Sequence, residues 1–98
     1  MSAYKLLQID LHKHQNNQAV IKTRFMAKKD DVLAVRDLYE HVATIDAESL
    51  NEVFEIGNMG PEENITRLKP MYSASVGDIV VDPIGKEYLV ASIGFTLL

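Results

Sequence analysis

Three side chains that could bind a metal ion lie at alternate positions near the N-terminus. They are Asp10, His12 and His14, in a segment from Lys5 to His14 where apolar and polar residues alternate. Alternate residues of a β-strand point to the same side, so one carboxylate and two imidazoles could share a divalent cation. A solvent-exposed strand face beside a polar turn explains the same pattern, and we favour that interpretation. The sequence implies no cofactor.

The motifs of several enzyme classes do not occur in the sequence. The chain has no cysteine, which excludes thiolate nucleophiles, disulfides and cysteine-ligated metals. A glycine-containing segment, residues 57–61, follows an expected helix, and its Pro61 lacks a backbone donor that a phosphate loop would need. Neither a serine nucleophile elbow nor a His-Glu-x-x-His motif is present. We therefore expect a protein that is not an enzyme, and an enzyme whose site is assembled from distant residues is the less favoured alternative.

Charge divides the chain into a basic and an acidic part. Residues 1–29 carry six basic side chains and one acidic side chain, a net charge of +5. Residues 30–98 carry four basic and thirteen acidic side chains, a net charge of −9. We favour the interpretation that the two parts largely compensate each other on the folded surface and keep the protein soluble.

Two alternatives give this charge a role in binding. The acidic part could meet a basic region of a protein partner or imitate a phosphate surface, through Asp46, Glu48, Glu52, Glu55, Glu62 and Glu63. Lys22 and Arg24 could instead attract the phosphates of a nucleic acid. The overall charge of −4 and the lack of an aromatic residue on the expected basic face make nucleic acid the weaker alternative.

The N-terminal part is expected to fold as a hairpin. Apolar and polar residues alternate from Lys5 to His14 and again from Ala19 to Met26, with the polar segment 15–17 between them. This period of two predicts two antiparallel strands. Placing both apolar faces on the same side sets Leu11 opposite Ile21.

A first helix is expected after this hairpin. From Asp30 onward, apolar residues recur at intervals of three and four positions. This spacing predicts a helix that ends near His41. A short segment with β-prone residues, 42–47, follows it and is expected to form a strand.

A second, short helix is expected to begin at Leu50. Ser49 and Glu52 have the spacing of a capping box, which marks a helix N-terminus. Residues 57–58, Gly-Asn, tolerate the left-handed conformation that often ends a helix. Residues 58–69 contain glycine, proline and several charges, and they are expected to form a loop.

The strongest local pattern is a hairpin near the C-terminus, from about Val76 to Leu98. Residues 82–85, Asp-Pro-Ile-Gly, fit a type I turn followed by glycine in the left-handed conformation, and this turn sets Val80 opposite Tyr88. Because both faces are apolar, the hairpin is expected either to lie in the core or to offer Val80 and Tyr88 to a partner. One face would carry Val76, Val80, Tyr88 and Val90, and the other would carry Ile79, Val81, Leu89, Ala91 and Ile93.

These elements predict one α+β domain over residues 1–98, in the order ββαβαββ. Two helices would pack on a curved antiparallel or mixed sheet, or on a sheet bent strongly enough to approach a small barrel. With 47% hydrophobic and 24% charged residues, the composition is that of an ordinary globular protein. No run approaches the roughly 18 apolar residues of a membrane span, and no signal-peptide pattern occurs. A cytoplasmic protein without a membrane partner is expected.

The C-terminal segment also carries a resemblance. The run Ser73–Val81, which contains Ser75-Val76-Gly77-Asp78, is followed by the turn Gly85-Lys86, a strand with Tyr88-Leu89-Val90, and Gly94-Phe95. This order resembles the ending of the YodL-like proteins and of similar small proteins of phages and plasmids. The resemblance covers about the last quarter of the chain and implies a phage or mobile-element origin, without site residues. Gly77 and Asp78 are expected to open a turn and to accept backbone N–H bonds.

The sequence as a whole favours a non-catalytic accessory protein of a phage or mobile element. We expect it to bind a host or viral protein in the bacterial cytoplasm, with modulation of that protein as one outcome. A homodimer that buries one apolar face of the C-terminal hairpin is left open. The alternatives are a small nucleic-acid-binding protein that uses the basic N-terminal hairpin and, less favoured, an enzyme.

Overall fold

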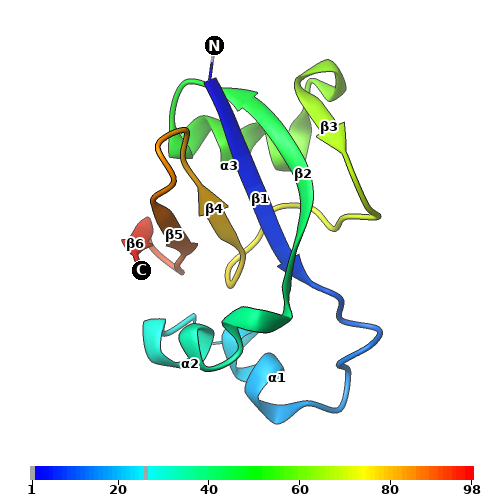
Figure 1. Cartoon of the computed structure of the whole chain (residues 1–98), viewed down its shortest axis with the longest axis vertical. Helices are drawn as coiled ribbons and strands as arrows, with labels where there is room; N and C mark the ends of the chain where they lie inside the picture. Colours follow the sequence, from blue (N-terminus) through cyan, green and yellow to red (C-terminus); the bar gives the residue numbers. More distant parts are fainter. Residues whose placement is uncertain (1, 26) are drawn as a thin grey trace.

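The computed structural model describes residues 2–25 and 27–98, and this part of the chain contains one six-stranded antiparallel sheet. The strands are β1 (Ser2–Ile9), β2 (Tyr39–Ala47), β3 (Ile65–Arg67), β4 (Ile79–Val81), β5 (Glu87–Val90) and β6 (Phe95–Leu97). Their order across the sheet is β3-β2-β1-β4-β5-β6. The sheet is open, because β3 and β6 form two separate edges at opposite sides of Figure 1.

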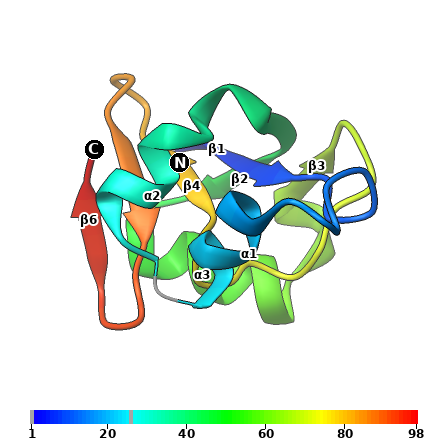
Figure 2. The same ribbon diagram turned by 90° about the horizontal axis from the view of Figure 1, so that it is seen from below.

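Three helices cover the two faces of this sheet within the described residues. They are α1 (Gln18–Phe25), α2 (Lys29–Ala34) and α3 (Leu50–Met59), with single 3₁₀ turns at η1 (Arg36–Leu38) and η2 (Glu62–Asn64). Figure 1 shows α3 behind β1, and Figure 2 shows α1 and α2 from below. None of the helices in the described ranges is long and apolar enough to cross a membrane.

Alternation along the central strands divides the core into two clusters. Leu6 of β1 and Val80 of β4 belong to a cluster with Val53 of α3. Their neighbours Leu7 and Ile79 point to the opposite face and belong to a cluster with residues of α1 and α2. Each face of the sheet therefore has its own helical cover, which confirms the predicted α+β class.

The predicted N-terminal hairpin is wrong, because α1 occupies the place of its second strand. β1 ends at Ile9, and residues 11–16 form turns, so Leu11 has no strand partner at Ile21. Met26, the last residue of the expected strand, lies outside the described residues. β1 pairs instead with β2 and β4.

The cap at Asn17 explains why this segment is helical. The Asn17 side-chain oxygen accepts N–H bonds from Ala19 at 3.0 Å and from Val20 at 3.3 Å. An asparagine in this position satisfies backbone donors that have no partner within the first turn of a helix. Val20 and Thr23, three positions apart, then face the core together, as residues of a helix do and residues of a strand do not.

The helix predicted from Asp30 to His41 is too long. α2 ends at Ala34, a 3₁₀ turn follows, and β2 begins at Tyr39. One core cluster still buries Val32, Val35 and Tyr39. The apolar spacing therefore identified residues of the core, although they belong to a helix, a turn and a strand. Residues 39–47 form a strand and not a continuation of the helix, because pairing with β1 gives hydrogen-bond partners to the backbone groups of this nine-residue strand. The pairing also buries alternate side chains.

The second predicted helix begins where expected and ends later. The Ser49 hydroxyl accepts the N–H of Glu52 at 3.2 Å, which places the cap of α3 as predicted. α3 runs on to Met59 and ends at Gly60, whose φ is 86°. The β-prone segment 42–47 is confirmed as a strand, as part of the longer β2.

Gly57 does not end α3. It lies within the helix, at a point where another segment of the chain packs closely against it. A Cβ at Gly57 would lie 2.8 Å from the Cβ of Ala74, so only glycine lets the segment after β3 approach. The expected loop of residues 58–69 is also partly regular. It contains η2 and the edge strand β3.

The C-terminal hairpin is confirmed in its turn and register. Val80 lies opposite Tyr88, and Gly85 has a φ of 94°. Its two apolar faces belong to the two core clusters, so the hairpin lies inside the sheet. The prediction was wrong in three details. β6 adds a third strand, Val76 packs on the face opposite to Val80, and Ile93 is 93% exposed.

Gly77 lies in a confined position between β4 and α1. Its φ is 96°, and a Cβ there would lie 2.6 Å from the carbonyl oxygen of Thr23. Its own carbonyl accepts a hydrogen bond from the hydroxyl of Tyr39, whose pKa burial raises to about 12. Both the backbone conformation and the space therefore require glycine.

Gly77→Ala is expected to lower the free energy of unfolding by about 3 kcal/mol, because it combines left-handed strain with a clash against α1. Gly85→Ala is the matched control. Gly85 has a similar φ of 94° but no atom within 4 Å of a Cβ, so its loss should be about 1 kcal/mol. Urea unfolding followed by circular dichroism measures both, and equal losses would contradict the close approach of Gly77 to α1.

Candidate protein-binding site

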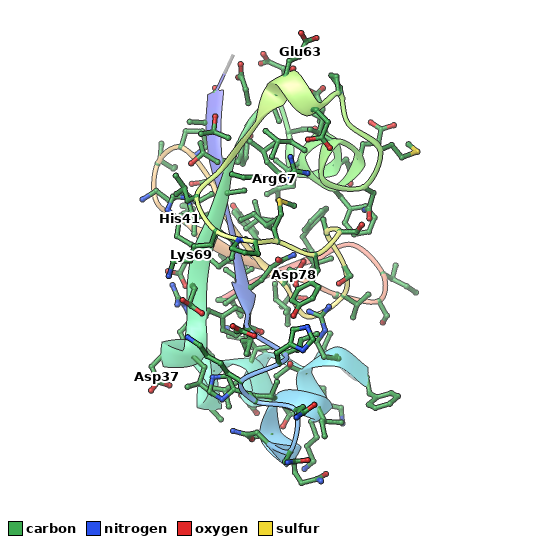
Figure 3. The ribbon with its side chains drawn as sticks, turned by 90° about the vertical axis from the view of Figure 1, so that its right-hand side faces the viewer. Asp37, His41, Glu63, Arg67, Lys69 and Asp78 are labelled. Atoms are coloured by element: carbon green, nitrogen blue, oxygen red, sulfur yellow. The ribbon has the colours of Figure 1, made fainter. Side chains whose placement is uncertain are left out.

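The carboxylate of Asp78 is the centre of a buried polar cluster. Asp78 is 0% exposed, and Figure 3 shows it in the middle of the molecule, with α1 below it. It accepts hydrogen bonds from Arg24 Nη1 at 2.8 Å, Gln8 Nε2 at 3.0 Å and the backbone N–H of Ser75 at 2.9 Å. Gln8 also donates to and accepts from the backbone of Tyr72, each at 3.0 Å.

This cluster holds the fold together and offers nothing to a ligand. Burial raises the pKa of Asp78, although hydrogen bonds from Gln8 and Ser75 and the charge of Arg24 act in the opposite direction. A perturbed buried carboxyl can mark an active site. Here, however, both carboxylate oxygens accept from donors of the protein itself. Among the described residues, no buried side-chain nitrogen or oxygen lacks a hydrogen-bond partner.

The two residues predicted to contact nucleic acid lie on α1 in different environments. Arg24 pairs with Asp78, and its Nη2 donates to the Ser75 hydroxyl at 2.6 Å, so its guanidinium is used internally. Lys22 is exposed. Phe25 is 78% exposed at the end of the same helix, which corrects the expectation that the basic part has no exposed aromatic residue. A nucleic-acid surface at this end would therefore use Lys22 and Phe25, without Arg24.

The three possible metal ligands lie in a turn, where alternate residues do not share a face. Asp10 Oδ1 accepts the N–H of His12 at 3.0 Å and of Lys13 at 3.2 Å. The bond from Lys13 is the main reason why the pKa of Asp10 is lowered. Within residues 2–25 and 27–98, no group of three or more His, Cys, Asp or Glu side chains is placed to hold a metal ion. His14 lies four positions beyond Asp10, at the end of this turn.

A groove of about 230 Å³ lies between α3 and the end of the sheet near β6. Asn51 and Phe54 line it from α3, and Val90 and Phe95 line it from β5 and β6. Phe54 is 37% exposed. The two phenylalanine rings give the groove apolar walls, which could receive an apolar side chain from another molecule.

Three of the predicted binding residues are close in sequence to Asn51, which lines this groove, although none of the three lines it. Asn51 lines it, Glu52 and Glu55 follow Asn51 by one and four positions, and Glu48 precedes it by three. Glu52 and Glu55 lie on α3 within about one helical turn of Asn51, whereas Glu48 precedes the N-cap Ser49 and lies outside the helix. The Glu48 N–H donates to Glu52 Oε1 at 3.3 Å, which holds these two residues together. No Lys, Arg or His occurs in residues 42–66, so this flank of the groove is negative.

β6 borders the groove and leaves its outer edge open. The Leu98 N–H donates to the Glu87 carbonyl at 2.9 Å, and the Ala91 N–H donates to the Gly94 carbonyl at 3.0 Å. Hydrogen-bonded pairs alternate in an antiparallel ladder. The backbone N–H and C=O groups of residues 94, 96 and 98 therefore point toward β5. The backbone N–H and C=O groups of residues 95 and 97 therefore point away from the sheet.

The other two predicted binding residues lie on the face of the sheet that α3 covers. Val80 is 1% exposed and belongs to the core. Tyr88 is half-buried and lies opposite Leu97, which is 52% exposed. Sequence reasoning missed that Phe54 and Leu97 each line a hollow at the surface. The available signal was the uncharged C-terminal run, residues 91–98, which contains four large apolar residues besides one alanine.

Arg24→Met is expected to cost about 3 kcal/mol of stability at pH 7, because it leaves the buried carboxylate of Asp78 without its cation. The loss should be smaller at pH 4. Burial already raises the pKa of Asp78 in the folded state, and removing Arg24 raises it further. The folded variant therefore binds a proton more tightly than the unfolded chain, and it loses stability as the pH rises above the ordinary carboxyl pKa.

Urea unfolding at pH 4 and pH 7 measures this difference against Lys22→Met as control. Lys22 is an exposed residue on the same helix, so its change should stay within about 0.5 kcal/mol at both pH values. An Arg24→Met loss that does not change with pH would show that Asp78 is not the group left uncompensated.

Comparison of the chain with models of protein families, with curated proteins and with solved structures finds no match. The resemblance of the C-terminal segment to the YodL-like proteins stays a prediction that this result does not test. The function is therefore inferred from the geometry of the groove, its acidic flank and the open edge of β6.

Proposed function

We propose that this protein is a non-catalytic accessory protein of a phage or mobile element that binds a basic segment of a host or viral protein. The site is the groove between Phe54 and Phe95 together with the acidic residues of α3. The likeness of the C-terminal segment to small phage and plasmid proteins supports the origin. Binding in the bacterial cytoplasm would modulate the partner by covering the segment that it uses for its own contacts.

The observation that carries this proposal is the combination of an apolar groove with a flank of a single charge. Phe54 and Phe95 line the groove, and Glu52 and Glu55 lie on α3 within about a helical turn of Asn51, with the N–H of Glu48 bonded to Glu52. Aromatic residues at the centre of an interface supply most of its affinity. Charges at the rim mainly set the association rate and reject partners of the same sign. The matching partner has a large apolar side chain with lysine or arginine beside it.

The size of the groove favours a side chain over a free small molecule. Sites for small molecules and cofactors usually enclose about 300–1,000 Å³. This groove holds about 230 Å³ and is open on one side. It therefore suits one side chain of a protein segment whose remainder lies along the surface.

Selection of a random-peptide library on the immobilised protein tests the proposal. We expect the enriched peptides to combine an aromatic or large aliphatic residue with neighbouring lysine or arginine, because those groups complement the groove and its flank. Enrichment of acidic peptides, or of no sequence at all, would contradict the proposal. Binding of single-stranded oligonucleotides that is lost in Lys22→Ala would instead assign function to the exposed end of α1.

Two variants then locate the binding of a selected peptide, measured by fluorescence anisotropy. Phe54→Ala removes one wall of the groove and should weaken binding about tenfold. Glu55→Lys should weaken it more at low salt than at high salt, because screening reduces the effect of the reversed charge. Met59→Ala is the matched control, since Met59 is 78% exposed on α3 but does not line the groove. Unchanged affinity in Phe54→Ala would place the peptide elsewhere.

A further inference from the structure

The two edges of the sheet differ in how well they are protected from another strand. Soluble proteins commonly protect an edge with charged residues, proline or a covering segment. β3 carries Arg67, which forms an ion pair with Glu62, and prolines lie on both sides of this strand, at positions 61 and 70. Residues 91–98, which include β6, contain neither a charged side chain nor proline. The edge of β6 is therefore the one that can accept a further strand.

Two hollows lie on either side of β6. The groove of about 230 Å³ opens on the face covered by α3, next to Phe95. A second hollow, of about 410 Å³, is lined by three leucines, Leu33 of α2 with Leu97 and Leu98, and by Gly85, Lys86 and Glu87 of the β4–β5 hairpin. Leu98 packs against the core cluster of α1 and α2, so this hollow reaches the opposite face of the sheet. Side chains of a strand point alternately to the two faces, so an added strand could use both hollows.

We infer that the partner segment binds in extended conformation as a seventh strand along β6, an inference that rests on the proposed function. The outward N–H and C=O groups of Phe95 and Leu97 pair with its backbone, as in other cases of strand addition. One of its apolar side chains enters the groove beside Phe95, and a second enters the hollow beside Leu98. Because residues 95 and 98 are three positions apart, about 10 Å along a strand, the two anchors of the partner are spaced i and i+3.

Charge favours a foreign segment over a second copy of the chain as the occupant. Two copies joined through antiparallel β6 strands would be related by a two-fold axis perpendicular to the sheet. Their α3 helices would then lie on the same face of the joined sheet. Each α3 carries Glu52 and Glu55 and no basic residue, so two acidic helices would be brought to one face and repel each other. A basic segment in the same place is attracted.

Hydrogen exchange on the wild-type protein tests the inference directly, with a peptide from the library selection as the probe. The amides of Phe95 and Leu97 should exchange at least tenfold more slowly when the peptide is bound, because they become donors to its backbone. The amide of Thr96, which faces β5, should change much less. Unchanged exchange at residues 95 and 97, with peptide bound, would overturn the inference.

Substitution by proline provides a second test. Leu97→Pro removes an outward N–H and keeps the ladder to β5, since residues 96 and 98 donate inward, and edge positions of this kind tolerate proline. We expect peptide affinity about tenfold below that of Leu97→Ala, which loses the same side chain and keeps the N–H. Thr96→Pro removes an inward donor and should destabilise the fold instead.

The outcomes separate this inference from the proposed function. The affinity of a peptide could depend on Phe54 and Glu55 and yet be equal for Leu97→Pro and Leu97→Ala. That result would keep the groove as the binding site and refute the added strand. A peptide that depends on none of these residues would refute both. A stable dimer by light scattering, abolished in Leu97→Pro, would show that the occupant is a second copy and overturn the inference.

Discussion

The buried carboxylate of Asp78 connects parts of the chain that are far apart in the sequence. It accepts hydrogen bonds from Gln8 of β1, Arg24 of α1 and the backbone N–H of Ser75. A carboxylate buried without these partners would cost several kcal/mol, a large part of the roughly 5–15 kcal/mol that stabilises a small domain. The attachment of α1 depends strongly on this cluster, because the helix buries only Val20 and Thr23 within the described residues.

The helix α3 is acidic, because it carries Glu52 and Glu55 and no Lys, Arg or His. All three arginines of the sequence form ion pairs: Arg24 with Asp78, Arg36 with Glu87 and Arg67 with Glu62. Figure 3 shows Glu63 at the end of the molecule opposite to α1 and α2. Figure 3 also shows Asp37 at the end of α1 and α2, and Arg67 toward the end of Glu63, so the separation of charge along the sequence is not kept in the folded molecule. Of the three arginines, Arg24 is the one whose partner is fully buried, and the proposed binding site lies beside the acidic helix α3.

Local chemistry made the C-terminal half of the fold predictable from sequence. Ser49 and Glu52 fix the start of α3, and residues 82–85 fix the turn and therefore the pairing of Val80 with Tyr88. The N-terminal half was harder because its periods are ambiguous over short segments. Residues 19–25 alternate like a strand, and only the cap at Asn17 and the burial of Thr23 show the helix.

The candidate site was predictable in its charge but not in its shape. Glu48, Glu52 and Glu55 were recognised from their sequence position, since a run of acidic residues without basic neighbours is visible there. The groove depends on Phe54 of α3 lying beside Phe95, which is forty-one positions later in the sequence. No local pattern encodes that approach. It results from the order of strands in the sheet, which brings β5 and β6 to the edge beside α3.

The central position of β1 has a consequence for how the protein is made. β1 leaves the ribosome before the other strands of this sheet, yet one of its two neighbours, β4, begins only at residue 79. Until then one side of β1 has no partner strand, and Leu7 lacks Ile79, a member of its cluster in the finished core. Contacts over such long sequence separations slow folding and leave nascent chains open to wrong associations. The domain can therefore complete its sheet only after most of the chain has been synthesised.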